Sequence, residues 1–347
     1  LHLVIISRED PPLPLSLLRG RGLITEIRLA DLRFTNEETA RLLNETMGLN
    51  LNAAQIESLG ARTEGWVSGL QLAALSMQGR SDVDNFVRSF TGSNRYILDY
   101  LIEEVFQQQP DDIKTFLLKT SILEQMTATL CDAVLATEEH TAPASHSQQI
   151  LEQLDRANLF IIPLDESRAW FRYHQLFGDL LRHHLRLSNT DVADLHCKAG
   201  SWLADHGFVG MAIEHLLSAQ AWEQAAGLIS KESSGLLRRG ENATLMRWVD
   251  LLPEENIHAN PELCLNCAWA LALSGQEDQA EAFLQIVETT ENIPQELVGN
   301  LLTAQIHIAR ARHDHQRTIA LSEQALSMIP EGGHEVRGVL NLNLGLA

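Results

Sequence analysis

Residues 193–347 carry helix signals alone, and this stretch therefore limits the fold more than any other part of the chain. Apolar residues recur there at helical spacing, and no segment alternates between apolar and polar residues as a half-buried strand would. The helical segments come in pairs of roughly 34 to 40 residues, the period at which helix hairpins stack into an α-solenoid. The predicted pairs are residues 195–205 with 211–218, 222–229 with 244–251, 263–274 with 276–288, and 295–312 with 316–329.

The N-terminal end of the chain has a different pattern. Residues 1–6 form a short unbroken apolar run, which predicts a strand buried on both faces, as in a parallel sheet. Prolines follow at positions 11 and 12 and exclude a helix there. Residues 25–29 alternate and predict a second short strand. Helical spacing begins at residue 36, after a capping box formed by Thr35 and Glu38.

The order of elements between residues 113 and 187 is that of a winged helix. We predict helices at 113–121, 130–135 and 150–157, strands at 159–164 and 170–174, and a closing helix at 175–187. The candidate recognition stretch, residues 151–156, holds Glu152 and Asp155 beside a single arginine. We therefore expect this winged helix to act as an internal clamp and not to bind DNA.

Charge and composition narrow the class of protein. The chain has 46 acidic and 26 basic residues, a formal net charge of −20, so it should repel a phosphate backbone. No apolar run approaches the ~20 residues that cross a bilayer, and the sequence shows no signal peptide. Four cysteines in a chain of this length do not indicate a secreted disulfide framework. These features predict a cytoplasmic protein with no membrane partner.

The sequence lacks the usual loop that holds a nucleotide phosphate. Such a loop needs glycines followed by lysine and then serine or threonine, so that backbone N–H groups and an ammonium meet the phosphates. None of the four lysines follows a glycine; they are Lys114, Lys119, Lys198 and Lys231. We therefore expect the chain on its own to bind ATP negligibly.

Two residues are candidates for a phosphate contact. Arg8 follows the first predicted strand, and its guanidinium is either a phosphate sensor or a solvated residue at a strand end. His174 lies where the second hairpin strand meets a helix, and it is either a structural histidine or a switch. Cys264 and Cys267 share one face of a predicted helix without a second pair at ligand spacing, so we predict no metal site there.

Several stretches together resemble one family. Residues 3–15 are similar to the sensor segment of the large ATP-binding LuxR-type transcriptional activators, the MalT-like members of the STAND signal-transduction ATPases. Further stretches resemble the same family, at residues 30–35, 62–75, 90–101, 116–123 and 171–181. The resemblance covers roughly residues 1–255 and continues to the end as a looser tetratricopeptide-like similarity.

The resemblance implies a mainly α protein built from four parts. They are the C-terminal remnant of an α/β nucleotide-binding domain (1–34), a helical lid (35–92), a winged helix with a β-hairpin (93–190), and a truncated tetratricopeptide-like α-solenoid that senses the inducer (191–347). The phosphate loop and the magnesium-binding acids would precede residue 1, and a DNA-binding helix-turn-helix would follow residue 347. The full-length protein would then be a slow signalling ATPase.

The resemblance also implies a switch between ADP and ATP. In this family an inactive monomer holds ADP, and a small-molecule or protein inducer on the superhelix permits exchange for ATP with magnesium, self-oligomerisation and action on promoters. Gln175 departs from the family pattern, because many relatives carry Asp after the histidine. The matching residues are Arg8 (sensor arginine), Arg19 and Arg21 (basic arm), Gly65 and Trp66 (loop near the adenine), and His174 (contact to the ADP β-phosphate).

Two other functions remain open. A helical-repeat scaffold that binds protein partners would have no nucleotide role, and Arg8 and His174 would then serve no switch. A hydrolase would need a nucleophile with its base, and no such set stands out in the sequence. The regulator predicts a glycine-rich phosphate loop upstream and a helix-turn-helix downstream in the coding sequence, whereas the scaffold predicts neither.

Overall fold

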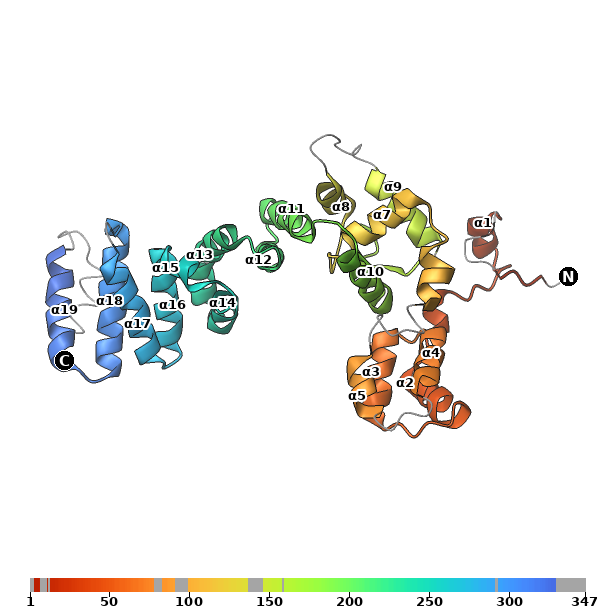
Figure 1. Ribbon diagram of the computed structural model, residues 1–347, viewed down its shortest axis with the longest axis horizontal. Helices are drawn as coiled ribbons and strands as arrows, with labels where there is room; N and C mark the ends of the chain where they lie inside the picture. The colour runs from red at the N-terminus through yellow and green to blue at the C-terminus, as the bar shows by residue number, and fades with distance from the viewer. Residues whose placement is uncertain are drawn as a thin grey trace. The chain divides into compact units, whose positions relative to one another are not determined.

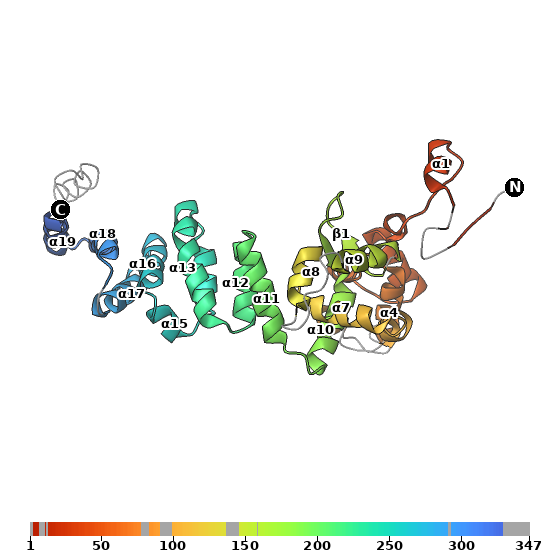
Figure 2. The same cartoon turned by 90° about the horizontal axis from the view of Figure 1, so that it is seen from above.

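The computed structural model describes residues 3–6, 11, 13–77, 83–90, 99–136, 146–157, 159–290 and 293–328. The chain divides into two compact units, residues 1–199 and residues 200–347. Helices dominate both units, as Figures 1 and 2 show, and the one sheet in the described residues has two strands. The mainly α fold predicted from the sequence is confirmed.

The helices of the stretch predicted to be a lid, called the lid below, lie in the first unit. They are α2 (Asn36–Ala40), the π-helix η2 (Arg41–Thr46), α3 (Ala53–Thr63), α4 (Val67–Met77) and α5 (Val83–Ser89). Side chains cap two of these helices, because Thr35 accepts from the N–H of Glu38, and Asn52 from that of Gln55. The guanidinium of Arg62 donates to the carbonyls of residues 87, 88 and 90 and so ties the end of α3 to the end of α5.

The winged helix also lies in the first unit, and its predicted hairpin is confirmed. Strand β1 (Ile161–Pro163) pairs antiparallel with β2 (Phe171–Tyr173), and Ile162 lies opposite Arg172. The carboxylate of Asp165 closes the turn by accepting from the N–H groups of residues 169 and 170. The helices around the hairpin are η3 (Ile102–Phe106), α7 (Asp111–Thr120), α8 (Ala128–Leu135), α9 (His146–Arg156) and α10 (Gln175–Leu187).

Helix hairpins make up the second unit, as predicted. Its main apolar core includes the buried Leu263, Ala268 and Leu284, and a smaller separate cluster contains Leu302, Ile306 and Ala325. Two details differ from the prediction: α13 continues to residue 239, and the short helix α15 was not foreseen. The helices are α11 (Val192–Asp205), which begins in the first unit, α12 (Val209–Ser218), α13 (Trp222–Arg239), α14 (Asn242–Val249), α15 (Glu254–His258), α16 (Pro261–Leu273), α17 (Glu277–Thr289), α18 (Gln295–Ala311) and α19 (His315–Met328).

The two strands predicted near the N-terminus are wrong. Residues 3–6 have no regular structure and are exposed, because a strand buried on both faces needs neighbouring strands, and the described residues supply only the β1–β2 hairpin. Residues 25–28 are irregular, and Leu29–Leu32 form the 3₁₀-helix η1. The carboxylate of Asp31 accepts from the N–H of Arg28 and so favours this turn over a strand.

None of the helices in the described ranges is both long enough and apolar enough to cross a membrane.

Candidate functional site

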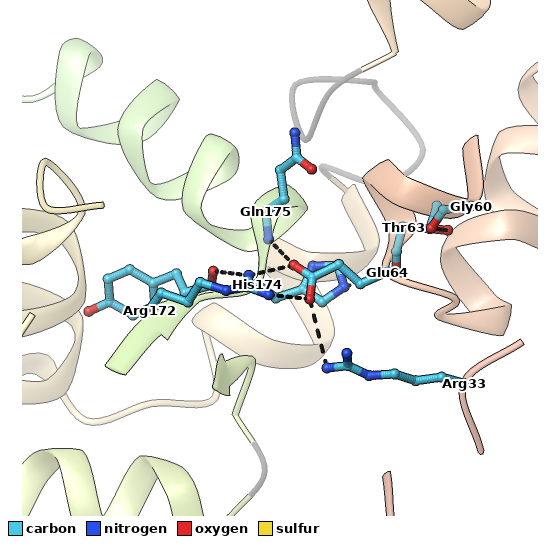
Figure 3. Close-up of polar contacts among 8 residues, drawn as sticks. Arg33, Gly60, Thr63, Glu64, Arg172, His174 and Gln175 are labelled. Carbon is cyan, nitrogen blue, oxygen red and sulfur yellow. Dashed lines mark hydrogen bonds and ion pairs between the residues drawn. The ribbon is translucent and has the colours of Figure 1, made fainter. Parts of the chain in front are cut away.

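Three of the six predicted site residues come together where the lid helices meet the winged helix. Gly65 and Trp66 follow α3, and their neighbour in space, His174, lies between β2 and α10. Figure 3 shows His174 beside Thr63 and Glu64. Arg8 lies outside the described residues. Arg19 and Arg21 lie at the end of α1 (Leu15–Gly20), where Arg19 forms an ion pair with Glu26. The roles assigned to these six residues stay predictions.

The turn after α3 places the lid's part of this site. The helix ends at Thr63, and Glu64 and Gly65 then take left-handed conformations with φ of 50° and 70°. The carbonyl of Gly65 accepts from the N–H of Phe34 at 2.9 Å. A Cβ at position 65 would lie 2.6 Å from the carbonyl oxygen of Phe34, so both the backbone conformation and the close approach require glycine.

Glu64 joins the lid to the winged helix. Its two carboxylate oxygens accept from both terminal nitrogens of Arg172, at 2.7 and 2.9 Å, in a bidentate pair (Figure 3). One of the oxygens also accepts from the backbone N–H of Gln175 at 3.0 Å. The guanidinium of Arg33 lies 3.7 Å from the other oxygen. One lid carboxylate therefore holds both ends of the segment that carries His174.

The environment keeps Glu64 ionised. Burial alone would raise the pKa of Glu64, since its side chain is only 10% exposed. The hydrogen bond and charge of Arg172 and the hydrogen bond from the N–H of Gln175 outweigh that effect and lower the pKa below its ordinary value. A charged carboxylate is therefore present at neutral pH where the lid meets the winged helix. This contact, called the seam below, is formed by Arg33, Thr63, Glu64, Arg172, His174 and Gln175.

His174 is buried against the lid. The ring nitrogen Nε2 donates to the carbonyl of Thr63 at 2.9 Å, and the residue is 6% exposed. The other nitrogen, Nδ1, is buried and has no hydrogen-bond partner in the described part of the chain. Burial lowers the pKa of His174, and Arg33 and Arg172 lower it further, against the opposing effect of Glu64. The ring is therefore neutral at pH 7, with its proton on Nε2.

The buried histidine predicts a dependence of stability on pH. Because the pKa of His174 is lower in the folded protein than its ordinary 6.5, the unfolded chain takes up the proton first as pH falls below that value, and stability drops. His184 and His196 have pKa values lowered by burial and act in the same direction. We expect the urea midpoint to fall between pH 7.5 and 5.5 by a smaller amount in His174→Gln than in the wild type.

The wild type and His174→Gln both keep His184 and His196, so the difference between their two drops reports on His174 alone. The exposed His206 supplies a control. Between pH 7.5 and 5.5 the urea midpoint of His206→Gln should fall by as much as that of the wild type. Equal drops in the wild type and His174→Gln would contradict the neutral, buried assignment of this ring.

Trp66 packs within an aromatic cluster. Its ring meets Phe160 edge-on at 5.1 Å, Tyr100 at 5.8 Å and His174 at 6.2 Å between centroids. A Cβ added at Gly69 would lie 2.5 Å from the indole, so this glycine makes room for the ring. The contacts of Trp66 thus join the lid to the hairpin region next to the polar bonds of Glu64.

A cleft of about 340 Å³ opens beside these residues. Its wall brings Glu64 and Glu124 together with the guanidiniums of Arg172 and Arg182. Arg182 is already bound, because it donates to Asp179 at 2.7 Å and to the carbonyl of Ser121 at 3.2 Å. The cleft is therefore lined by charges of both signs, of which Glu64, Arg172 and Arg182 already have partners.

The sequence did not reveal four of the residues that build this seam. They are Arg33, Glu64, Arg172 and Gln175, of which only Gln175 had been noted, as a departure from the family pattern. One signal was available, because Glu64 immediately precedes Gly65. A glycine at the end of a helix commonly takes a left-handed conformation. Nothing in the sequence pairs Glu64 with Arg172, which lies 108 positions away.

The thiols of Cys264 and Cys267 stay protonated near neutral pH. Cys264 and Cys267 are both buried in α16, and burial raises the pKa of their thiols to about 11 and about 12. Among the described residues, no group of three or more His, Cys, Asp or Glu side chains could hold a metal ion.

Comparison with known proteins shows which proteins this chain resembles. Residues 102–193 match the family described as the MalT winged helix domain. The HTH-type transcriptional regulator MalT of Cronobacter sakazakii is 31% identical over 344 residues, which cover 95% of this chain and 36% of that protein. The serine/threonine-protein kinase PknK of Mycobacterium tuberculosis is 31% identical over 290 residues, which cover 83% of this chain and 26% of the kinase. The chain thus spans about a third or less of the length of these relatives.

Among solved structures, a STAND protein with a tetratricopeptide repeat sensor from Pyrococcus horikoshii is similar, with a TM-score of 0.36 and 12% identity over 90% of this chain and 50% of that one. A likeness of that size carries no functional conclusion. The sequence similarity to the curated relatives is much stronger, and it extends across both units. The chain is accordingly MalT-like, and the MalT winged helix domain lies at residues 102–193.

Proposed function

We propose that this chain is the central part of a cytoplasmic transcriptional activator that is gated by ADP and ATP and responds to an inducer. The helical repeats of the second unit would bind the inducer, a small molecule or a protein, on a surface formed by successive hairpins. The first unit would couple nucleotide state to self-association. A helix-turn-helix outside this chain would contact DNA, as the name of the MalT relative suggests.

The polar seam between lid and winged helix is the observation that supports this function. Two consecutive lid residues, Thr63 and Glu64, bind Arg172, His174 and Gln175 through four hydrogen bonds. A joint made from a few directed bonds can form and break as a unit, which a switch between two domain arrangements requires. A scaffold has no comparable need for a buried, charged joint at this point.

The residues present fit a nucleotide phosphate in one specific respect. Nδ1 of His174 is a buried ring nitrogen that lacks a partner in the described ranges, and Arg33 and Arg172 place positive charge beside it. Donation to a phosphate oxygen would require a second proton on this ring, and the charge of the phosphate would favour that protonation. In this proposal His174 binds the phosphate of ADP, and residues outside this chain hold the magnesium.

Nucleotide binding by the full-length protein tests the proposal. We expect His174→Ala to weaken ADP binding by about tenfold or more, because it removes a hydrogen bond to a charged group. His183→Ala, which changes a half-buried histidine farther along α10, should bind ADP as the wild type does. Calorimetry on both variants measures the two affinities. Equal ADP affinity in His174→Ala and the wild type, or submicromolar ATP binding by residues 1–347 alone, would count against the proposal.

A further inference from the structure

We infer that Glu64 is the positioning residue of the seam: its carboxylate holds the segment around His174 against the lid, and loss of that charge lets the winged helix separate from the lid. This inference rests on the proposed function, because it names the group that would govern the switch. Nothing in the comparisons assigns a role to Glu64. Glu64 accepts three hydrogen bonds, takes a left-handed backbone conformation and lies near a second arginine, Arg33.

The bonds of Glu64 flank the histidine on both sides. Arg172 lies two positions before His174, and Gln175 follows it directly, and both donate to the same carboxylate. The ring itself has one bond to the lid, from Nε2 to the carbonyl of Thr63. Without the Glu64 carboxylate, the direct polar contacts that the described residues make between positions 63–64 and 172–175 reduce to this single neutral hydrogen bond (Figure 3).

The bonds made by Glu64 are of the strong type. Each of the three has an ionised acceptor, and the pair to Arg172 is bidentate, which fixes direction as well as distance. The side chain of Glu64 is 10% exposed and that of Arg172 is 33% exposed, so solvent weakens the pair only in part. The neighbouring polar contacts at the seam are weaker, because they are neutral or longer than 3.5 Å.

The backbone of Glu64 points to the same role. Its φ of 50° lies in the left-handed region, which a glutamate adopts only where its surroundings impose it. Gly65 follows with φ of 70° and closes the helix end through its own N–H bond to the carbonyl of Gly60 at 3.1 Å. The strained conformation turns the carboxylate of Glu64 from the end of α3 toward the hairpin and α10.

Arg33 makes the joint reversible. Its guanidinium lies 3.7 Å from the carboxylate of Glu64, which is within ion-pair range but beyond a direct hydrogen bond. If Arg172 leaves with the winged helix, Arg33 can move closer and keep Glu64 paired on the lid side. Opening therefore does not strand a buried charge, whose cost would otherwise hold the seam closed.

Hydrogen exchange of single amides in this chain tests the inference. In Glu64→Gln, which keeps the size of the side chain and removes its charge, we expect the amide of Gln175 to exchange about tenfold faster or more. The amides of α7 and α9 should keep wild-type protection, which shows that the domain remains folded. Glu124→Gln is the matched control, since this carboxylate lines the same cleft but has no bond to the hairpin segment in the contacts described above.

The conservative variant separates charge from shape. Glu64→Asp keeps a carboxylate and tolerates a positive φ well, so its exchange rate at Gln175 should lie nearer the wild type than that of Glu64→Gln. Unchanged exchange in Glu64→Gln, or equal acceleration in Glu124→Gln, would overturn the inference. The reverse order of the aspartate and glutamine variants would also overturn it.

A second measurement distinguishes this inference from the proposed function. ADP dissociation from the full-length protein should be faster in Glu64→Gln by a similar factor if the seam governs nucleotide retention. Faster amide exchange with unchanged ADP dissociation would leave Glu64 as the positioning residue and would overturn the nucleotide gate. Unchanged amide exchange overturns the role of Glu64 whatever the nucleotide result.

Discussion

Replacing Gly65 with alanine should lower the free energy of unfolding of the first unit by about 2–4 kcal/mol. Two costs add at this position. The φ of 70° is unfavourable for any residue with a Cβ, and the new Cβ would lie 2.6 Å from the carbonyl oxygen and 2.9 Å from the nitrogen of Phe34. The backbone must shift to relieve that overlap, and the shift moves Glu64 and Trp66 on either side. Urea unfolding of the chain measures the loss.

Gly48 provides the matched control for Gly65. It has nearly the same backbone conformation, with φ of 72°, but an added Cβ there meets nothing within 4 Å. Gly48→Ala should therefore cost only the conformational part, about 1–2 kcal/mol. If the two variants lose the same stability, the close approach of Phe34 contributes nothing, and the tight turn of the seam is not as described.

Replacing Arg172 with methionine should cost about 2–3 kcal/mol, because it leaves the carboxylate of Glu64 mostly buried without its main partner. We place the value below that of a fully buried pair, since Arg172 is one-third exposed and Arg33 can approach Glu64. Adding Glu64→Gln should recover part of the loss. The double variant should be more stable than the sum of the single changes predicts, by about 1–2 kcal/mol.

An exposed ion pair provides the control for the Arg172 and Glu64 variants. Arg156 and Glu152 form an ion pair at 3.0 Å on α9, with side chains 75% and 46% exposed. Arg156→Met should cost about 0.5 kcal/mol or less. A cost for Arg172→Met no larger than that, or strictly additive losses in the double variant, would show that the Glu64–Arg172 pair does not hold the seam.

The helices and the hairpin could be predicted from the sequence because their signals are local. Helical spacing of apolar residues gave the repeat hairpins of the second unit, and the polar turn at Asp165 between two apolar runs gave the β1–β2 hairpin. The same local method failed at residues 3–6. An apolar run indicates burial, but a strand also needs neighbouring strands, which the run itself does not specify.

The candidate site could be predicted only in part. Gly65, Trp66 and His174 were found through family resemblance, and they do meet at one place. Glu64 and Arg172 were missed because their pairing depends on how two separate segments pack, and a charged residue on a helix end or a strand usually faces solvent. His174 was recognised as a candidate, but its bond to the carbonyl of Thr63 depends on the same packing.

The distance between lid and winged helix in the full-length protein tests the central claim most directly. Spin labels on cysteines introduced at position 57 on α3 and position 186 on α10 would report it, since Glu57 and Arg186 are both exposed. Cys197, which is half-buried, is replaced by serine, as is any reactive cysteine outside this chain. We predict one short, narrow distance distribution with ADP, and a longer or broader one with ATP and inducer or in Glu64→Gln. The same short, narrow distribution under all three conditions would contradict a nucleotide-controlled seam.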